Sequence, residues 1–482
     1  MQPCPGVSGL SRKQQLLKRH RRNKRVALLV IVLALIVVGC LVVWWLPLVL
    51  AVLVWAGHEA WFSDHLFYTP QDDYQYRFPE RNEVPGVRLQ NDCLVSEQLP
   101  PLAGDETLVL ALSVKSTWLG RFLDPCVVLI GGSEGQSLTD RQTFERGVDG
   151  LRYLNLTGFG AALAAGTLRI RGRHCRLREA PRLWVFRHAD ARRQRVMVIA
   201  PHADDAELAA FGLYSQADES WIVTLTAGEI EAEHYQRMGM PKAEAARIKG
   251  RLRAWDSVTV PRWAGVPESR CVQLGYFCLQ LPAMQAAPDQ PIASREADLS
   301  DIRLFRQFNT LRLPADADGA PTWNNLIADL RALLSEARPQ VLVMPHATLD
   351  PHPDHICAQA AVLEALQGLD WQPDVVLGYA NHLHDNDRWP MGDVYSGVAL
   401  PPVFESSETL IPYSIELDTE QQRDKAMALG MMHDLQPPPP LKRKVRRWLQ
   451  KLLAGRRWPA EGENEFFRKA VRRHELFWRS ER

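Results

Sequence analysis

The segment Val198–Gly212 reads VIAPHADDAELAAFG, and it places polar side chains directly after an apolar run. The run RVMVIA (Arg195–Ala200) predicts a buried strand, the segment Glu207–Gln216 is compatible with a helix, and WIVTLT (Trp221–Thr226) predicts a second strand. Buried strands that alternate with helices indicate an α/β fold with a Rossmann-like, largely parallel sheet. We therefore predict one domain of this class over residues 190–435.

A second strand with polar residues behind it follows later in the chain. Apolar residues at helical spacing from Trp323 to Ala337 predict a helix that Pro339 ends, and VLVMP (Val341–Pro345) predicts the next strand. The segment after this strand holds three histidines and two aspartates within ten positions: His346, Asp350, His352, Asp354 and His355. Histidines rarely gather in this way for packing alone, so the segment indicates a functional site.

The two polar segments together predict a metal site. Sites in open α/β sheets form at the carboxyl ends of strands, so the two segments are expected to meet. Two imidazoles and one carboxylate suit a catalytic zinc ion with an open fourth position. The ligands would be His202, Asp205 and one of His352 or His355, with Asp204 left free to move a proton. Taken alone, the first segment has a plainer interpretation, a polar turn in which Asp205 caps the following helix.

The motifs resemble those of the PIG-L/LmbE superfamily of zinc-dependent N-acetylglucosaminyl deacetylases. Members carry HPDDE or HADDxE after a strand and HPDH later, and here His202–Glu207 reads HADDAE and His352–His355 reads HPDH. Thr226–Glu229 (TAGE) is similar to the T-x-G-E that follows the second strand in many members. The resemblance spans about Arg195–Ala380. One departure lies at Ala209–Gly212, where AAFG replaces the usual GCGG or GMGG, so the pocket wall is expected to differ.

The resemblance implies a role for each motif residue. His202, Asp205 and His355 would bind Zn²⁺, Asp204 would be the general base, and His352 would face the substrate carbonyl. The reaction it implies is hydrolysis of the acetamide of an N-acetylated amino sugar in an envelope glycan or glycolipid. An N-terminal anchor and a basic C-terminal helix, described below, favour a lipid-linked or lipopolysaccharide amino sugar as the substrate, and a soluble small-molecule conjugate is the alternative.

Two rival functions use the same residue types. A metal-dependent phosphoesterase also gathers His and Asp at strand ends, but it usually needs more ligands and two metals about 4 Å apart. A non-catalytic envelope protein would keep the fold and only bind glycans. The formal net charge of +1 over 482 residues disfavours nucleic-acid binding, so no nucleic-acid partner is expected.

The N-terminal region predicts attachment to a membrane. A basic tail (residues 1–25), with eight Lys or Arg within residues 12–25, precedes an uncharged apolar anchor (residues 26–56) that is long enough to cross a bilayer. Because the positive charge precedes the span, we expect a bacterial inner-membrane protein with its catalytic domain on the periplasmic side. Pro47 lies inside the apolar run, and it leaves open a re-entrant hairpin that returns the chain to the cytoplasmic face.

A polar linker (residues 57–86) is expected between the anchor and a small β-sandwich-like domain (residues 87–187). In the run TLRIRG, Leu168 and Ile170 alternate with arginines, as in a half-buried antiparallel strand. A carbohydrate-binding module and a packing spacer both fit this domain. The eight cysteines show no metal-binding or redox spacing, and they suit buried free thiols. A Cys93–Cys175 disulfide is the alternative outside the cytoplasm.

The C-terminal region (residues 436–482) begins with QPPPP, a rigid break, and continues into LKRKVRRWLQKLLAGRR. Leu441, Val445, Trp448 and Leu452 share one helical face, and Lys and Arg occupy the other. This pattern is typical of a helix that lies on an anionic membrane surface. It fits equally well a helix that docks on the catalytic domain with its basic face in solvent.

Overall fold

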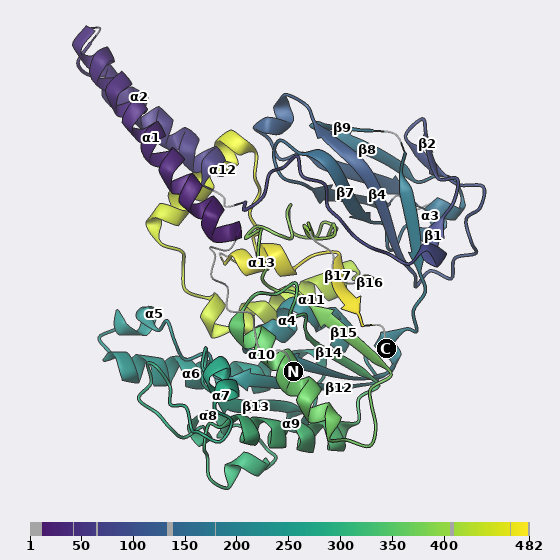
Figure 1. Ribbon diagram of the computed structural model, residues 1–482, viewed down its shortest axis with the longest axis vertical. Helices are drawn as coiled ribbons and strands as arrows, with labels where there is room; N and C mark the ends of the chain where they lie inside the picture. Colours follow the sequence, from purple (N-terminus) through teal and green to yellow (C-terminus); the bar gives the residue numbers. More distant parts are fainter. Residues whose placement is uncertain are drawn as a thin grey trace.

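The protein has three parts: an N-terminal helical hairpin, a two-sheet β unit and a mixed α/β unit (Figure 1). Its structure is a computed structural model that describes residues 12–41, 43–63, 66–132, 138–178, 180–404, 409–462 and 464–480. The first eleven residues of the predicted basic tail lie outside the described residues.

The α/β unit is built on a seven-stranded sheet. Five strands run parallel, and the last two strands of the sheet are antiparallel to their neighbours. Their order across the sheet is β13 (Cys271–Tyr276), β12 (Glu219–Thr226), β11 (Arg195–Ala200), β14 (Val341–Pro345), β15 (Val375–Tyr379), β17 (His474–Arg479) and β16 (Ile411–Glu416).

Both faces of this sheet are buried under helices. In β11, Val196 and Val198 face one core cluster, and Met197 and Ile199 face the other. This burial on both faces explains why the strand is apolar throughout rather than alternating. Helices α4 (Asp205–Tyr214) and α11 (Thr419–Met431) contribute to the first cluster, and α9 (Trp323–Ala337) and α10 (Pro353–Gln367) contribute to the second. The remaining helices of the unit are α5 (Glu233–Gln236), α6 (Lys242–Thr259), α7 (Leu281–Ala286) and α8 (Arg303–Arg306).

The sheet extends beyond the predicted boundary of residues 190–435. Strand β17 comes from the C-terminal region and inserts between β15 and β16, with Trp478 paired to Gly378 on one side and to Pro412 on the other. Residues 474–479 therefore belong to the α/β unit. The basic composition that precedes them concealed this strand.

The β unit consists of two five-stranded antiparallel sheets. One sheet holds β1 (Glu83–Val84), β10 (Arg182–Phe186), β4 (Thr107–Ser116), β7 (Asp149–Asn155) and β9 (Cys175–Leu177). The other holds β2 (Arg88–Gln90), β3 (Cys93–Val95), β8 (Arg169–Arg173), β5 (Cys126–Gly131) and β6 (Leu138–Thr143). A short helix, α3 (Gly160–Ala164), follows β7. Leu110 of one sheet and Ile170 of the other are buried in one shared core.

The seven cysteines in the described residues are free thiols.

The predicted polar linker packs against the protein instead of forming a free tether. Tyr68 and Tyr74 are buried in a cluster that also contains Trp184 of the β unit and Trp478 of the α/β unit. Aromatic side chains supply large apolar areas, which explains how this polar segment can be held between two units. The linker thus helps to fix the β unit against the α/β unit.

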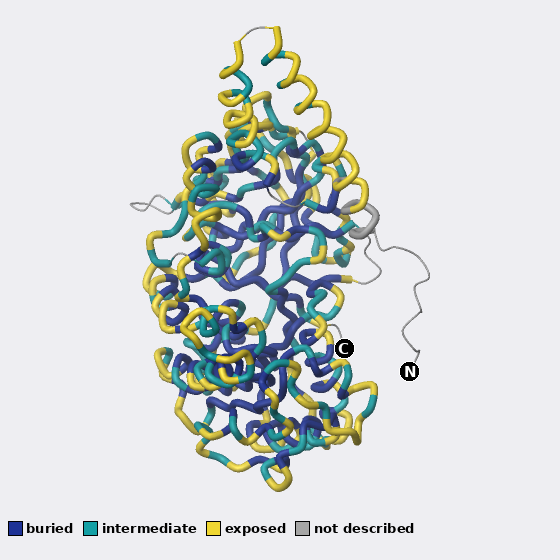
Figure 2. The backbone as a smooth tube through the Cα atoms, turned by 90° about the vertical axis from the view of Figure 1, so that its left-hand side faces the viewer, coloured by how far each residue is buried: buried dark blue, intermediate teal, exposed yellow. Residues whose placement is uncertain are grey.

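The apolar N-terminal stretch, predicted as one anchor over residues 26–56, forms two helices joined by a turn, as in the hairpin that Pro47 left open. Helices α1 (Arg12–Leu41) and α2 (Leu46–Gly57) lie side by side and are joined by a turn in which the Leu46 amide donates to the Val43 carbonyl. Pro47 lies at the start of α2, where its missing N–H disrupts no helical hydrogen bond. Figure 2 shows both helices exposed along most of their length.

Within the described residues, one helix, Arg21–Leu41, is long and apolar enough by length and composition to cross a membrane, and the shorter apolar helix Leu46–Phe62 follows it. The turn of the hairpin points away from the other units, and the basic start of α1 lies at the same end as those units (Figures 1 and 2). The apolar tip is therefore the part of the molecule that suits a bilayer.

The C-terminal amphipathic helix α12 (Leu441–Ala454) packs against the base of the hairpin. Arg446 Nε lies 2.5 Å from Glu59 Oε2, and Gln450 Nε2 donates to Ser63 Oγ at 3.1 Å. Its apolar residues Trp448 and Leu452 remain exposed. The short helix α13 (Glu465–Ala470) then leads into β17.

A buried ion pair at the linker gives a testable prediction for stability. Arg152 is fully buried, pairs with Glu145, and donates to the carbonyl oxygens of Pro70 at 2.8 Å and Asp72 at 2.9 Å. The substitution Arg152→Met would leave a buried carboxylate without its partner, which costs about 3–5 kcal/mol. We expect a clear fall in the denaturation midpoint of the full chain, measured by tryptophan fluorescence.

Arg178→Met is the matched control. Arg178 pairs with Asp149 at 3.1 Å at a half-exposed position, where an ion pair contributes less than about 1 kcal/mol. Equal midpoints for the two variants would show that the buried pair does not hold the linker.

Candidate active site

The first polar motif forms a tight turn between β11 and α4. The Asp205 carboxylate accepts the His202 backbone N–H at 2.9 Å, which folds the turn back on itself. Asp204 is the N-cap residue of α4 but makes no side-chain cap hydrogen bond, so neither aspartate acts as a conventional helix cap. The plainer interpretation of this motif as a capped turn is therefore not what the structure shows.

The second polar motif lies at the next parallel strand, β14, which pairs directly with β11. After β14 the chain turns through Asp350, and His352 becomes the N-cap of α10. The His352 Nδ1 atom accepts the Asp354 backbone N–H at 3.3 Å. His355, in the first turn of α10, is fully buried and lies against the first motif. The adjacency of the two strands thus brings both motifs to one edge of the sheet.

Three of the predicted metal ligands form a nearly equilateral triangle of donor atoms. His202 Nδ1 lies 3.1 Å from Asp205 Oδ2, His355 Nε2 lies 3.2 Å from the same oxygen, and the two nitrogens are 3.4 Å apart. Ligands of a tetrahedral ion at about 2.0–2.1 Å are roughly 3.3–3.4 Å apart. The donor types and spacing therefore fit one divalent metal ion.

Further donors surround this triangle and make other groupings possible. The donor atoms of His202, His352 and His355 also lie close enough together to hold one ion, and so do those of Asp205, His355 and His382. The other nitrogen of His202, Nε2, lies 3.2 Å from Asp354 Oδ2, and Cys278 completes that grouping. The set with Cys278 offers a sulfur donor, whereas the predicted ligands offer two nitrogens and one oxygen.

A second layer of hydrogen bonds orients the triangle. His355 Nδ1 lies 2.9 Å from Asp350 Oδ2, and that carboxylate also accepts the backbone N–H groups of Asn381 and His382 at 2.9 and 3.1 Å. The Asn381 side chain donates to Asp205 Oδ1 at 2.8 Å. Such partners fix the orientation of metal ligands and usually matter for affinity.

The electrostatics of the cluster favour a cation at its centre. Burial opposes protonation of His355, but the carboxylates of Asp205 and Asp350 outweigh it and raise the pKa of His355 to about 9. Burial also opposes ionisation of Asp205, yet His355 and His202 hold the pKa of Asp205 well below its usual value. A metal ion would take the place of the proton that this arrangement otherwise holds.

His352 is electrostatically different from the two histidines of the triangle. Burial, together with the nearby charges of His202 and His355, lowers the pKa of His352 to about 4. The ring is therefore neutral near pH 7. Because its Nδ1 accepts a backbone N–H, the proton of the neutral ring is on Nε2, which makes that atom a hydrogen-bond donor.

Asp204 lies outside the triangle and is held by an arginine. Its Oδ1 atom accepts from Arg253 Nη2 of α6 at 3.0 Å, and Arg253 also pairs with Asp434. Gly228 makes room for this arginine, because a Cβ at Gly228 would lie 2.3 Å from Arg253 Nε, and its φ of +61° also favours glycine. The glycine of the TAGE motif thus permits the contact that positions Asp204.

Glu229, the glutamate of the TAGE motif, supports His202 indirectly through a series of hydrogen bonds. Glu229 accepts the Cys278 backbone N–H at 3.1 Å, and the next amide, that of Leu279, donates to Asp354 at 2.8 Å. Asp354 in turn lies against His202. Glu229 therefore supports the turn that holds Asp354, rather than touching the donor triangle.

Sequence reasoning placed five residues at this site and missed several others. The structure brings His202, Asp204, Asp205, His352 and His355 together at one sheet edge. Asn381 and His382, from the loop after β15, also lie at the site. Arg253 and Cys278 carry no motif signal, because their positions depend on how α6 and β13 pack.

The fold and the donor cluster define a mixed α/β protein with a candidate metal centre at the carboxyl ends of two parallel strands. Residues 197–366, about a third of the chain, match the family model PIG-L, described as GlcNAc-PI de-N-acetylase. The chain therefore carries a PIG-L domain, and the predicted resemblance is confirmed. The match supports a deacetylase, a hydrolase that acts on an acetylated substrate.

No curated protein matches the chain. Among solved structures it is similar to a deacetylase triple mutant involved in the teicoplanin biosynthetic pathway, with 16% identity and a TM-score of 0.30, over 60% of this chain and 99% of that one. It is also similar to GalB, the 4-carboxy-2-hydroxymuconate hydratase from Pseudomonas putida, with 13% identity and a TM-score of 0.29, over 53% of this chain and 83% of that one. These low scores support no inference about this chain.

The geometry of the triangle gives a prediction that does not depend on activity. His355→Ala removes one donor and should greatly reduce the metal content of the purified full chain, measured by inductively coupled plasma mass spectrometry. Asp350→Asn removes only the outer partner of His355, and we expect metal affinity to fall by about 10–100-fold. Full metal content in His355→Ala would contradict the ligand assignment.

Proposed function

We propose that this protein is a zinc-dependent de-N-acetylase that hydrolyses the acetamide of an N-acetylated amino sugar. The observation that carries the proposal is the triangle of His202, Asp205 and His355 within a PIG-L domain. Two nitrogens and one oxygen at this spacing suit zinc and leave a coordination position for water or substrate.

The other side chains of the site supply proton transfer and charge stabilisation. When bound, zinc would supply Lewis acidity toward the amide carbonyl and the attacking water. Asp204 would accept the proton of that water and return it to the leaving amine. Arg253 holds the Asp204 carboxylate at 3.0 Å and therefore orients it for this transfer.

His352 would stabilise the negative charge that develops on the carbonyl oxygen. Its ring is neutral near pH 7 because its pKa is lowered to about 4 by burial and by the neighbouring histidines. Its Nδ1 accepts a backbone N–H, so its Nε2–H is available to donate to an oxyanion. Donors that are already oriented toward developing charge usually make a large contribution to catalysis.

The structural classes that we propose for the two folded units follow from their strand order. Five parallel strands, in the order β13, β12, β11, β14 and β15, support a Rossmann-like class for the α/β unit. Two antiparallel sheets with a shared core support a β-sandwich-like class for the β unit.

The substrate that we propose is a lipid-linked or lipopolysaccharide amino sugar of an envelope glycan. The apolar hairpin supports this assignment, because it would hold the catalytic unit close to a membrane surface. A bacterial inner membrane remains our proposal for the location.

The hairpin changes the side of the membrane that we favour. The periplasmic placement rested on a single span, with the basic residues on one side and the catalytic unit on the other. In the hairpin, the basic start of α1 and the catalytic unit lie at the same end. The positive-inside rule then supports the alternative, in which the tip enters the bilayer and the catalytic unit stays on the cytoplasmic face.

Acetate release tests the proposed chemistry. The zinc-loaded full chain should release acetate from an N-acetylglucosaminyl lipid, and Asp204→Asn should lower the rate about 10²–10⁴-fold while zinc content is unchanged, because only the proton acceptor is lost. Asp298→Asn, at a highly exposed carboxylate, is the control, and it should leave both the rate of acetate release and the zinc content unchanged.

Loss of zinc in Asp204→Asn would assign Asp204 to the metal instead. Zinc-loaded chain that releases phosphate from phosphoesters but no acetate would replace the deacetylase proposal with the phosphoesterase.

Membrane topology is tested with reporters fused after Arg482. The hairpin predicts an inactive alkaline phosphatase fusion and a fluorescent green fluorescent protein fusion, because the first reporter needs export and the second folds in the cytoplasm. A fusion at the hairpin turn is the informative control. Active alkaline phosphatase after Arg482 would restore the single span and the periplasmic catalytic unit.

A further inference from the structure

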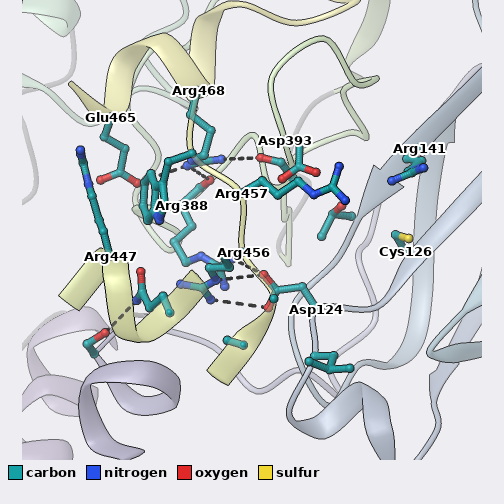
Figure 3. Close-up of a pocket in the computed structure, with 18 of the residues that line it drawn as sticks. Asp124, Cys126, Arg141, Arg388, Asp393, Arg447, Arg456, Arg457, Glu465 and Arg468 are labelled. Atoms are coloured by element: carbon teal, nitrogen blue, oxygen red, sulfur yellow. Dashed lines mark hydrogen bonds and ion pairs between the residues drawn. The ribbon is translucent and has the colours of Figure 1, made fainter. Parts of the chain in front are cut away.

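A cavity of about 480 Å³ lies where the three parts of the molecule meet. Its lining comes from the base of the hairpin, from the β unit, from α12 and the segment after it, and from the loop around Arg388 in the α/β unit. Figure 3 shows these segments around one space. None of the lining residues falls within residues 197–366, so the cavity is separate from the PIG-L domain.

The cavity is strongly basic. Nine of its lining residues are arginines, and four are aspartates or glutamates, so the wall carries an excess of positive charge. A lining of this kind would repel cationic ligands and favour anions. The arginines come from different segments, which means that folding assembles the charge rather than one basic run of sequence.

One buried carboxylate binds several of these arginines together. Asp124 of the β unit lies 2.9 Å from Arg388, 3.0 Å from Arg456 and 3.3 Å from Arg146. Burial opposes the ionisation of Asp124, but the three guanidinium groups outweigh it and hold its pKa far below the usual value. Even with Asp124 ionised, this part of the wall keeps net positive charge.

Other arginines face the cavity without an internal counter-charge. Arg141 (β6), Arg173 (β8) and Arg457 (after α12) line it, and none of the three forms a salt bridge with another residue in the described parts of the chain. Figure 3 shows Arg141 and Arg457 on opposite segments that border the same space. Their guanidinium groups remain available to a ligand.

The surroundings of the cavity suit a membrane lipid. Ser63 at the base of the hairpin lines it, as does Gln450 of α12. The outer face of α12 exposes Leu441, Trp448 and Leu452, and the apolar hairpin begins at the same place. A lipid could therefore place its chains along these apolar surfaces while its headgroup enters the basic space.

We propose that this cavity binds the phosphate group of a membrane lipid headgroup. Guanidinium groups match phosphate geometry by paired hydrogen bonds, and several arginines around one space are typical of phosphate recognition. Glu465 lines the cavity, and the ring of its neighbour Phe466 lies 6.4 Å from the His382 ring at the metal centre. If the bound lipid also carries the amino sugar, which rests on the proposed function, its phosphate would be held beside the catalytic site.

Calorimetric titration of the full chain in detergent tests this site without an activity assay. Mixed micelles that contain short-chain phosphatidic acid should bind, and the double variant Arg141→Gln/Arg173→Gln should weaken binding at least about tenfold. These arginines lie on the β unit, away from the apolar face of α12, so their loss does not alter general adsorption of that helix. Arg457→Gln tests the opposite wall, and it should also weaken binding.

Arg169→Gln is the matched control, because Arg169 is exposed on the same strand as Arg173 but does not line the cavity. Its binding should equal that of the natural chain. Unchanged binding in Arg141→Gln/Arg173→Gln or in Arg457→Gln would overturn the proposal. Equal binding of micelles that carry a fatty-acid carboxylate would overturn the phosphate assignment, and inorganic pyrophosphate that binds as tightly as phosphatidic acid would overturn the lipid assignment.

Discussion

The pairing of β11 with β14 is the constraint on which the rest of the site depends. Parallel neighbours end at the same edge of a sheet, so two motifs about 150 residues apart in sequence deliver His202, Asp205 and His355 to within 3.4 Å of one another. Burying three polar groups this close together is unfavourable in free energy unless a cation interacts with them. The apolar strands, the outer carboxylate of Asp350 and the turn that holds Asp354 all serve this close approach.

The units outside the PIG-L domain are held to the α/β unit by a few specific contacts. The linker aromatics fix the β unit, Asp124 joins three segments through arginines, and α12 rests on the base of the apolar hairpin. A basic cavity results at the junction, next to the loop that supplies Asn381 and His382 to the metal centre. The residues that we propose for lipid binding and those that we propose for catalysis are therefore neighbouring but separate sets.

Sequence patterns predicted the parts of this structure that rest on local chemistry. Apolar strand runs and the HADD and HPDH motifs located the sheet edge and its five polar residues, because strand burial and metal-ligand types leave strong local signals. Arg253 could not be predicted, since its contact with Asp204 requires the packing of α6 and the absence of a side chain at Gly228. Pro47 marked the hairpin as an alternative to a single span, because a proline inside an apolar run is a local signal. Strand β17 was missed because its pairing with β15 and β16 depends on contacts distant in sequence.

The central claim is that one metal ion is held by two imidazoles and one carboxylate at this sheet edge. X-ray absorption spectroscopy at the zinc edge of the zinc-loaded full chain tests it most directly, because the spectrum reports donor type and distance. The account predicts nitrogen and oxygen donors only, at about 2.0–2.1 Å. A sulfur donor at about 2.3 Å, from Cys278, or a second metal at about 3.5–4 Å would contradict it.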